Sequence, residues 1–112
     1  MSKVFDSNNN ANLEYSSIDS SQIISPPEIK TGFADMGETS SLKTGVWVHP
    51  VGISTDVEVD EVFVVIEGRG RIILKDGKIL QLFPGAVGTL HSGEETRWEI
   101  DETLKKVWVV SK

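Results

Sequence analysis

Cysteine is absent from the 112 residues of this chain. Its absence excludes a disulfide framework, a zinc site with cysteine ligands and a cysteine nucleophile. A chain of this length can still bury the core of one domain without cross-links. The lack of cysteine also suits a reducing compartment.

Long hydrophobic runs and an excess of basic residues are missing as well. No apolar stretch approaches the roughly 20 residues that span a bilayer, and residues 1–12 lack the apolar segment of a secretory signal. We therefore expect a cytoplasmic protein with no membrane partner. Lys and Arg number 11 against 17 Asp and Glu, and the resulting net charge of −6 argues against nucleic acid as a partner.

Helical periodicity is absent too, and short apolar runs separated by turn residues take its place. We expect strands over residues 45–49, 62–67, 71–75, 78–83, 86–90, 96–100 and 106–110. Gly68 and Gly70 are expected to bracket a turn, Asp76-Gly77 predicts a hairpin with a primed turn, and Pro84-Gly85 marks a further turn. About seven strands with turns every 8–12 residues predict an all-β sandwich or closed barrel.

The composition changes near residue 40. Residues 1–40 are rich in Ser, Asn and acids, and Pro26-Pro27 favours extended backbone. Such a segment cannot bury enough surface to fold alone. We expect a polar N-terminal arm over residues 1–40, partly disordered or packed on the barrel or on a partner subunit, and a barrel domain over residues 41–112.

Alternation of side chains along a strand predicts which of them point inward. The acids of residues 55–60 are expected to face solvent; they are Asp56, Glu58 and Asp60. The opposite face carries Val57, Val59, Phe63 and Val65. Glu61 falls with this apolar set, and an inward carboxylate needs a partner, a metal or a raised pKa. The alternative is that the strand twists and leaves Glu61 half solvated at the barrel rim.

The same alternation places Trp98 inside, together with Thr96 and Ile100. Arg97 and Glu99 then face solvent. A tryptophan on an apolar face is usually part of the core, and at a barrel mouth it would form a pocket wall.

The motifs resemble, in their order, the single-domain cupins of the (S)-ureidoglycine aminohydrolase-like group, over roughly residues 44–112. The first cupin motif is matched by Glu61 followed after six residues by Gly68, and the second by Pro84-Gly85, Gly93 and Trp98. A strand that begins Gly45-Val46-Trp47 also resembles this group. The resemblance implies a cupin-type jelly-roll barrel with an open mouth, here with an extended N-terminal arm, and a homodimer.

The resemblance also implies a divalent metal, held by two His and a Glu of the first motif and one His of the second. This chain keeps Glu61 alone, because the other positions fall near Thr55 and Val57 and at Thr96. Imidazole is the usual nitrogen ligand of such metals. We therefore expect no cofactor at the standard site. A rearranged site for Mn, Fe, Ni or Zn, formed by Glu61, His49 and His91, is the alternative hypothesis.

Three functions remain open at this point. In the first, the barrel mouth binds a small polar or carboxylated molecule, and the expected pocket residues are Trp47, His49, Thr55, Val57, Glu61, His91, Thr96 and Trp98. In the second, the protein is a ureidoglycine aminohydrolase-like or other cupin hydrolase or isomerase, in which Glu61 and His91 exchange protons with the substrate. In the third, the N-terminal arm or an edge strand mediates self-association. The motifs do not decide whether the protein is an enzyme.

Overall fold

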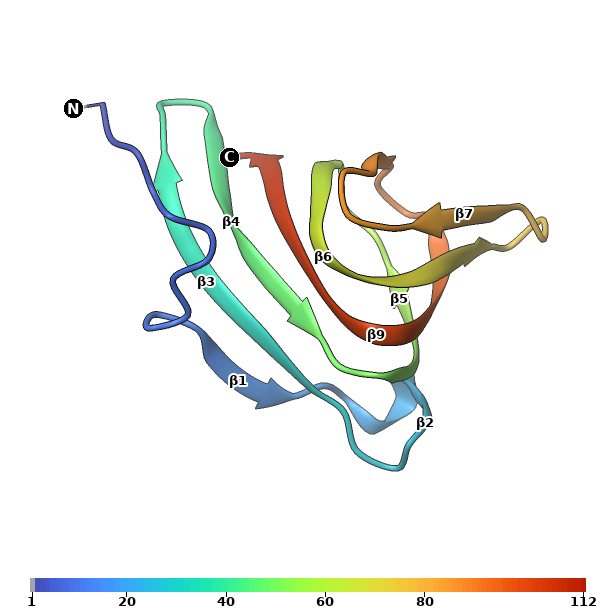
Figure 1. The fold of residues 1–112 in the computed structure, drawn as a ribbon. Coiled ribbons are helices and arrows are strands. Elements are labelled where there is room, and N and C mark those ends of the chain that lie inside the picture. Colours follow the sequence, from blue (N-terminus) through green and yellow to red (C-terminus); the bar gives the residue numbers. More distant parts are fainter. Residues whose placement is uncertain (1) are drawn as a thin grey trace.

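The computed structural model describes residues 2–112 as one curled antiparallel β-sheet with a single short 3-10 helix, η1 (Ser20–Gln22). The strands of these residues are β1 (Glu14–Ser17), β2 (Ile23–Ser25), β3 (Lys30–Glu38), β4 (Leu42–His49), β5 (Gly52–Val57), β6 (Glu61–Leu74), β7 (Ile79–Leu82), β8 (Val87–Leu90) and β9 (Glu95–Ser111). Figure 1 shows the sheet as an open trough, with β3 and β4 on one side and β6 and β7 on the other. The expected all-β class is confirmed.

The longest strand, β9, lies at the centre of this arrangement. Its first half pairs with β5, its second half pairs with β4, and β6 runs along its other edge for most of its length. The path across the sheet is β1-β3-β4-β9-β5-β2, and β6 also pairs with β7 and β8. Both β6 and β9 curve strongly, which brings the two sides of the trough to face each other (Figure 1).

The turn expected between Gly68 and Gly70 is absent, because β6 continues through both glycines as one strand. Instead, its register with β9 shifts several times between Val65 and Gly70. Gly68 has a φ of +90°, which suits a β-bulge. A Cβ at this position would meet the backbone of β9 at Thr103 and Leu104. The glycine therefore bends the strand where a tight turn was expected, and residues 96–100 and 106–110 likewise form one strand, not two.

The hairpin expected at Asp76-Gly77 is confirmed and joins β6 to β7. Its turn is of a different type, however. The N–H groups of Leu74 and Gly77 bond to Lys78 and Leu74 across a three-residue loop, and Gly77 alone in this loop has a positive φ. A three-residue hairpin needs one such residue, whereas the primed turn needs two. The turn at Pro84-Gly85 is also present, closed by the Ala86 N–H donating to Phe83 O at 2.9 Å.

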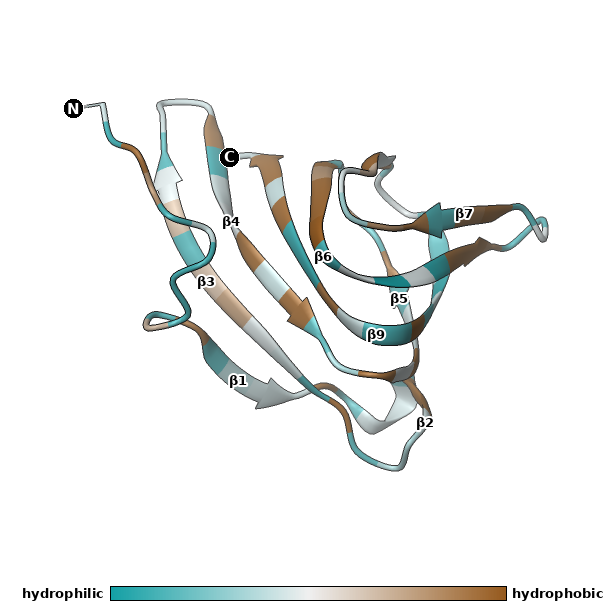
Figure 2. Ribbon diagram, viewed as in Figure 1, coloured by the Kyte–Doolittle hydropathy of each residue, from teal (hydrophilic) through white to brown (hydrophobic). Residues whose placement is uncertain are grey.

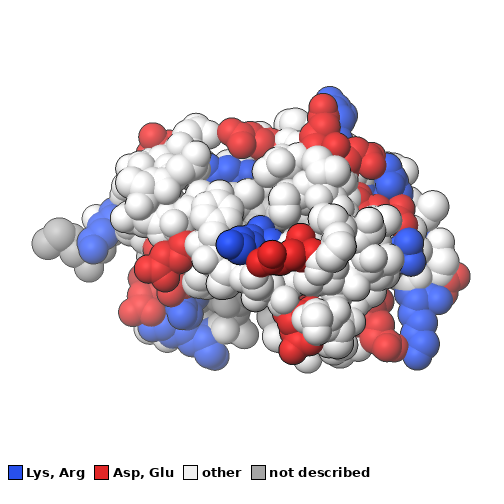
Figure 3. Space-filling model, turned by 90° about the horizontal axis from the view of Figure 1, so that it is seen from below, with Lys and Arg blue, Asp and Glu red and all other residues white. Residues whose placement is uncertain are grey.

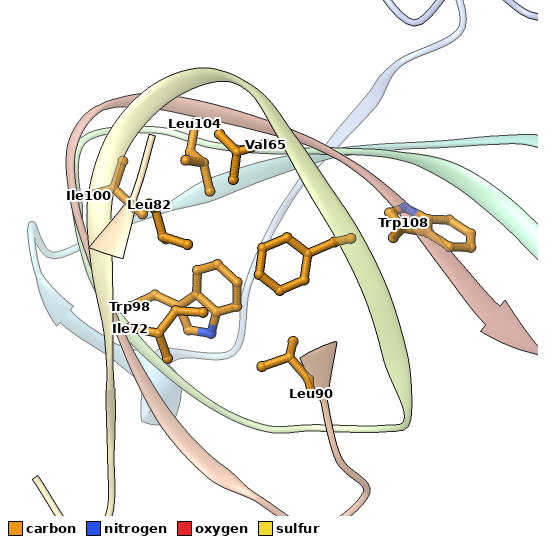
Figure 4. Packing of buried hydrophobic residues seen from close by; sticks show 9 residues of the cluster. Val65, Ile72, Leu82, Leu90, Trp98, Ile100, Leu104 and Trp108 are labelled. Carbon is orange, nitrogen blue, oxygen red and sulfur yellow. The ribbon is translucent and has the colours of Figure 1, made fainter. Parts of the chain in front are cut away.

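The hydrophobic core lies inside the trough and comes from β6, β7, β8 and β9. Brown apolar bands alternate with polar ones along β6 and β9 in Figure 2, as expected for strands with one buried face. The buried cluster consists of Phe63, Val65, Ile72, Leu82, Leu90, Trp98, Ile100, Leu104 and Trp108. In Figure 4, Trp108 stands apart from the rest of the labelled group. The densest packing is thus at one end of the trough, and Trp108 extends the apolar face toward the other.

Residues 14–38, within the segment expected as a polar arm, contribute β1, β2 and β3 to the sheet. The residues before β1 run alongside β3 (Figure 1). They are fastened by Asn10, whose Oδ1 accepts a 2.6 Å hydrogen bond from the buried ammonium of Lys105. The domain boundary near residue 40 and the homodimer stay predictions.

The basic residues of the β6–β7 hairpin face outward and pair with acids of β9. The pairs are Arg69–Glu102, Arg71–Glu99, Arg71–Asp101 and Lys75–Glu95. Figure 3 shows one face of the molecule, on which acidic and basic side chains lie beside one another and basic residues do not gather into a patch. Among residues 2–112 we find no helix with the length and apolar character to cross a membrane.

Candidate ligand-binding site

A cavity of about 370 Å³ opens on the inner face of the sheet. Its walls come from β3, β4, β5 and β9, from the segment that joins β5 to β6 with Glu61 at the start of β6, and from Ile18 and Gln22 before and within η1. All three tryptophans of the chain line it, namely Trp47, Trp98 and Trp108. Phe33 adds a fourth ring, stacked on Trp108 with centroids 5.4 Å apart. The cavity is thus a concave, aromatic space of the size that small ligands occupy.

The ammonium of Lys106 lies in this cavity, paired with Glu61. Lys106 Nζ is 2.5 Å from Glu61 Oε2, and the two side chains are 6% and 12% exposed. The same Nζ lies 4.7 Å from the ring centroids of Trp47 and Trp98 and 4.9 Å from that of Phe63. Cation–π attraction and the ion pair therefore both offset the cost of burying the ammonium.

Glu58 was expected to face solvent, but the residue is only 8% exposed. Its Oε2 accepts hydrogen bonds from the Thr96 hydroxyl at 2.6 Å and from the Trp98 indole N–H at 3.0 Å. The alternation fails because β5 ends at Val57 and the backbone leaves the extended conformation before β6 begins. Val57 and Val59, expected inside, are 63% and 60% exposed for the same reason.

His49 is fully buried at the end of β4, with both ring nitrogens engaged. Nδ1 lies 2.6 Å from the Pro50 carbonyl oxygen, which can only accept, so Nδ1 carries the proton. Nε2, 2.8 Å away, then accepts from the Ser54 hydroxyl. Burial lowers the pKa of His49 below its ordinary 6.5, and the positive charge of Lys106 lowers it further against the opposing Pro50 bond. The imidazole is therefore a neutral structural group.

Asp56 lies at the edge of the same cavity. Its Oδ1 accepts from the Val57 N–H at 2.8 Å and from the Gln22 amide at 3.3 Å. Although Asp56 is exposed, partial desolvation raises its pKa above the ordinary 3.8, against the Val57 N–H bond and the charge of Lys106, and the Glu61 carboxylate adds a smaller rise. Within residues 2–112 no lysine or arginine forms an ion pair with this carboxyl group, and its hydrogen-bond donors are uncharged.

The structure brings together five of the eight residues expected in the pocket: Trp47, His49, Thr55, Glu61 and Trp98. Three others lie elsewhere. Thr96 lies behind the wall, bonded to Glu58, whereas Val57 and His91 are exposed outside the cavity. The expected exchange of protons by both Glu61 and His91 with one bound substrate therefore has no geometric basis, because His91 lies outside the cavity. Asp56 is a second carboxyl group that lines the cavity with Glu61.

Sequence reasoning missed Lys106 and Trp108, although the signal was available. Leu104, Lys106 and Trp108 alternate along one strand, so a lysine between two apolar residues was on the inward face by the test that placed Glu61 there. Glu58 had no such signal, because its burial depends on where β5 ends.

The donor set of the cavity does not fit the metal that cupins commonly hold. Glu61, the one retained ligand, is bonded to an ammonium, and the other standard positions carry Thr55, Val57 and Thr96. The rearranged set fails as well, because His91 is exposed and both nitrogens of His49 are engaged. Within residues 2–112, no three or more His, Asp or Glu side chains gather as metal ligands.

These features agree with a comparison of the chain against known protein families, in which residues 36–108 match the EutQ-like cupin domain. The chain belongs to this cupin family. A search of curated proteins finds none that matches this sequence. The chain is similar in fold to the EutQ protein of Clostridium difficile, with a TM-score of 0.70 at 17% identity, over 88% of this chain and 79% of that one. It is also similar to a EutQ protein of Salmonella typhimurium, with a TM-score of 0.63 at 15% identity, over 87% of this chain and 93% of that one.

A protein of unknown function from Pseudomonas syringae is more similar, with a TM-score of 0.79 at 25% identity. The match covers 93% of this chain but 45% of that one, so the present cupin domain spans less than half of that protein's length. The expected cupin-type barrel is confirmed by the family and by these folds, whereas the finer resemblance to ureidoglycine aminohydrolases stays a prediction.

Proposed function

We propose that this cupin binds a small polar molecule in the cavity at the mouth of its barrel. The observation that carries the proposal is the combination of a cavity of about 370 Å³, walls made by every tryptophan of the chain, and charged groups held at its base by buried hydrogen bonds. Aromatic walls with a few fixed polar groups are typical of small-molecule sites. A core that served only stability would fill this space with apolar side chains.

The test is to measure saturation transfer by NMR from the protein to a library of small amines, carboxylates, amides and sugars. Thr31→Trp would fill the cavity, since Thr31 lines it, whereas Thr89→Trp adds the same side chain to an exposed position of β8. We expect some compounds to bind the native protein and the Thr89 variant and to lose the signal with the Thr31 variant. Absence of any hit, or hits insensitive to the Thr31 change, would refute the proposal.

A metal-free hydrolase of the ureidoglycine aminohydrolase type is the second candidate. It is favoured by the position of Asp56 beside Glu61, since one carboxyl with a raised pKa next to an ionised one suits acid–base work. The assay is ammonia release from ureidoglycine. Activity lost in Asp56→Asn and kept in Glu67→Gln, an exposed carboxylate outside the cavity, would support catalysis. Native protein that releases no ammonia above the uncatalysed rate would remove this candidate.

A further inference from the structure

The charges around the cavity are unbalanced. Four carboxylates line it, from Asp35, Asp56, Glu58 and Glu61, against the two ammonium groups of Lys43 and Lys106. The lysines are each committed to one acid: Lys43 lies 3.8 Å from Asp35, and Lys106 lies 2.5 Å from Glu61. Since His49 is neutral, the lining carries an excess of negative charge.

The excess resides on Asp56 and Glu58. In the part of the chain that the structure describes, their hydrogen-bond partners are uncharged: a backbone N–H and a glutamine amide for Asp56, and a hydroxyl and an indole for Glu58. Asp56 is exposed at the cavity edge, yet partial desolvation of its carboxylate without a bonded cation still carries a cost, which raises its pKa against the opposing Val57 N–H bond and Lys106 charge. A ligand that brought a positive charge would relieve this cost, whereas an anion would add to it.

The aromatic lining points the same way. The rings of Trp47 and Trp98 in the lining, together with that of Phe63 in the core, already surround one cation, Lys106 Nζ, at less than 5 Å. The stacked rings of Trp108 and Phe33 form a further part of the wall, and no cation of residues 2–112 lies over them. Ring faces attract cations in addition to any carboxylate nearby. The cavity thus offers both unpaired negative charge and a free aromatic surface.

We propose that the ligand of this pocket is a small organic cation, an ammonium or guanidinium compound, and that Asp56 supplies its counter-charge. The proposal rests on the proposed function, because it names the chemical class that the same cavity would bind. Anionic ligands are disfavoured by the excess of carboxylates, although Lys106 is at hand, because Glu61 already neutralises that ammonium.

The test compares choline with 3,3-dimethylbutan-1-ol, which has the same shape with carbon in place of the charged nitrogen, and with acetate. Intrinsic fluorescence reports binding directly, since every tryptophan lines the cavity. We expect choline to bind about tenfold more tightly than the alcohol. Asp56→Asn should reduce the affinity for choline several-fold and leave the affinity for the alcohol unchanged. Glu67→Gln, which removes one exposed charge, should leave both unchanged.

The outcomes separate the two proposals. If the alcohol or acetate binds as tightly as choline, the pocket is a ligand site but the inference about charge is wrong. The inference about charge is also wrong if Asp56→Asn lowers the affinity for choline no more than Glu67→Gln does. It is wrong again if choline does not bind while neutral or anionic compounds of the NMR library do. If no probe and no library compound binds, the proposed function falls together with the inference.

Discussion

Removal of the buried ammonium at Lys106 should destabilise the fold more than removal of its partner Glu61. At an effective dielectric constant of 20, two unit charges 4 Å apart attract by about 4 kcal/mol, and the observed 2.5 Å separation makes the attraction stronger. Much of this attraction offsets the cost of desolvating both groups. When one partner is removed, that cost remains for the other, and measured losses are about 3–5 kcal/mol.

The surroundings of the pair make the two single losses unequal. Lys106→Met leaves the Glu61 carboxylate buried with no cation at 12% exposure, so we expect the full loss of about 3–5 kcal/mol. Glu61→Gln leaves the ammonium inside three aromatic rings and keeps an oxygen that can accept its hydrogen bond. We expect a loss of about 1–3 kcal/mol for this variant. The double variant Glu61→Leu with Lys106→Met should recover most of the stability, since apolar residues replace such pairs well.

Urea unfolding followed by circular dichroism measures these free energies without relying on tryptophans that the substitutions themselves affect. The slope of the free energy against urea should stay constant, so that changes in midpoint report stability. A Lys106→Met protein within about 1 kcal/mol of the native one would mean that water solvates Glu61 after all. A double variant as unstable as Lys106→Met alone would show that the loss comes from packing and not from an orphaned charge. Either result would refute the reasoning.

Three further predictions concern single groups. Because folding lowers the pKa of His49, the unfolded chain binds a proton at this residue before the folded chain does. The contribution of His49 to stability should be fully present above pH 6.5 and should fall by up to about 1.4 kcal/mol per pH unit as the pH drops toward the folded pKa. His49→Gln should abolish this slope when the free energy of unfolding is measured in urea at each pH. Gly68→Ala should lower the melting temperature more than Gly77→Ala does. Both glycines have a φ of +90°, but only at Gly68 would a Cβ meet the backbone of another strand. Equal decreases in melting temperature would contradict the bulge geometry. Glu58→Leu should lower the free energy of unfolding by about 1–3 kcal/mol and shift the tryptophan emission, because the Trp98 N–H loses its carboxylate acceptor. An unchanged emission spectrum would argue against this hydrogen bond.

Patterns of neighbouring residues in the sequence were sufficient to predict the all-β class of the fold. Alternating apolar residues and turn signals predicted strands that overlap β4, β6, β7, β8 and β9, although β5 (Gly52–Val57) was not predicted, and Asp76-Gly77 predicted a hairpin at its correct position. The same signals failed at Gly68, since a glycine with positive φ serves a tight turn and a bulge equally well. What distinguishes them is the partner strand β9, which lies some 30 residues further along the chain, beyond the reach of any local pattern.

The candidate site was predictable to the extent that its residues lie within strands. Glu61 and Trp98 lie in β6 and β9, and both line the cavity. Asp56, Val57 and Glu58 lie where β5 ends, so their side chains depend on how the backbone leaves the sheet. Alternation could have placed Lys106 on the inward face of its strand, but not beside Glu61, because only the pairing of β6 with β9 brings the two side chains together.

The central position of β9 also has a consequence for how this protein is made. Strands β4, β5 and β6 each have β9 as a neighbour, yet β9 is the last of the described strands to leave the ribosome. Until then, the inner faces of the earlier strands have no central strand to pack against, and their pairings span long stretches of chain. The nascent chain should therefore expose the apolar residues of its earlier strands until the 17 residues of β9 have emerged, and this domain should then fold in a single late step that depends on β9.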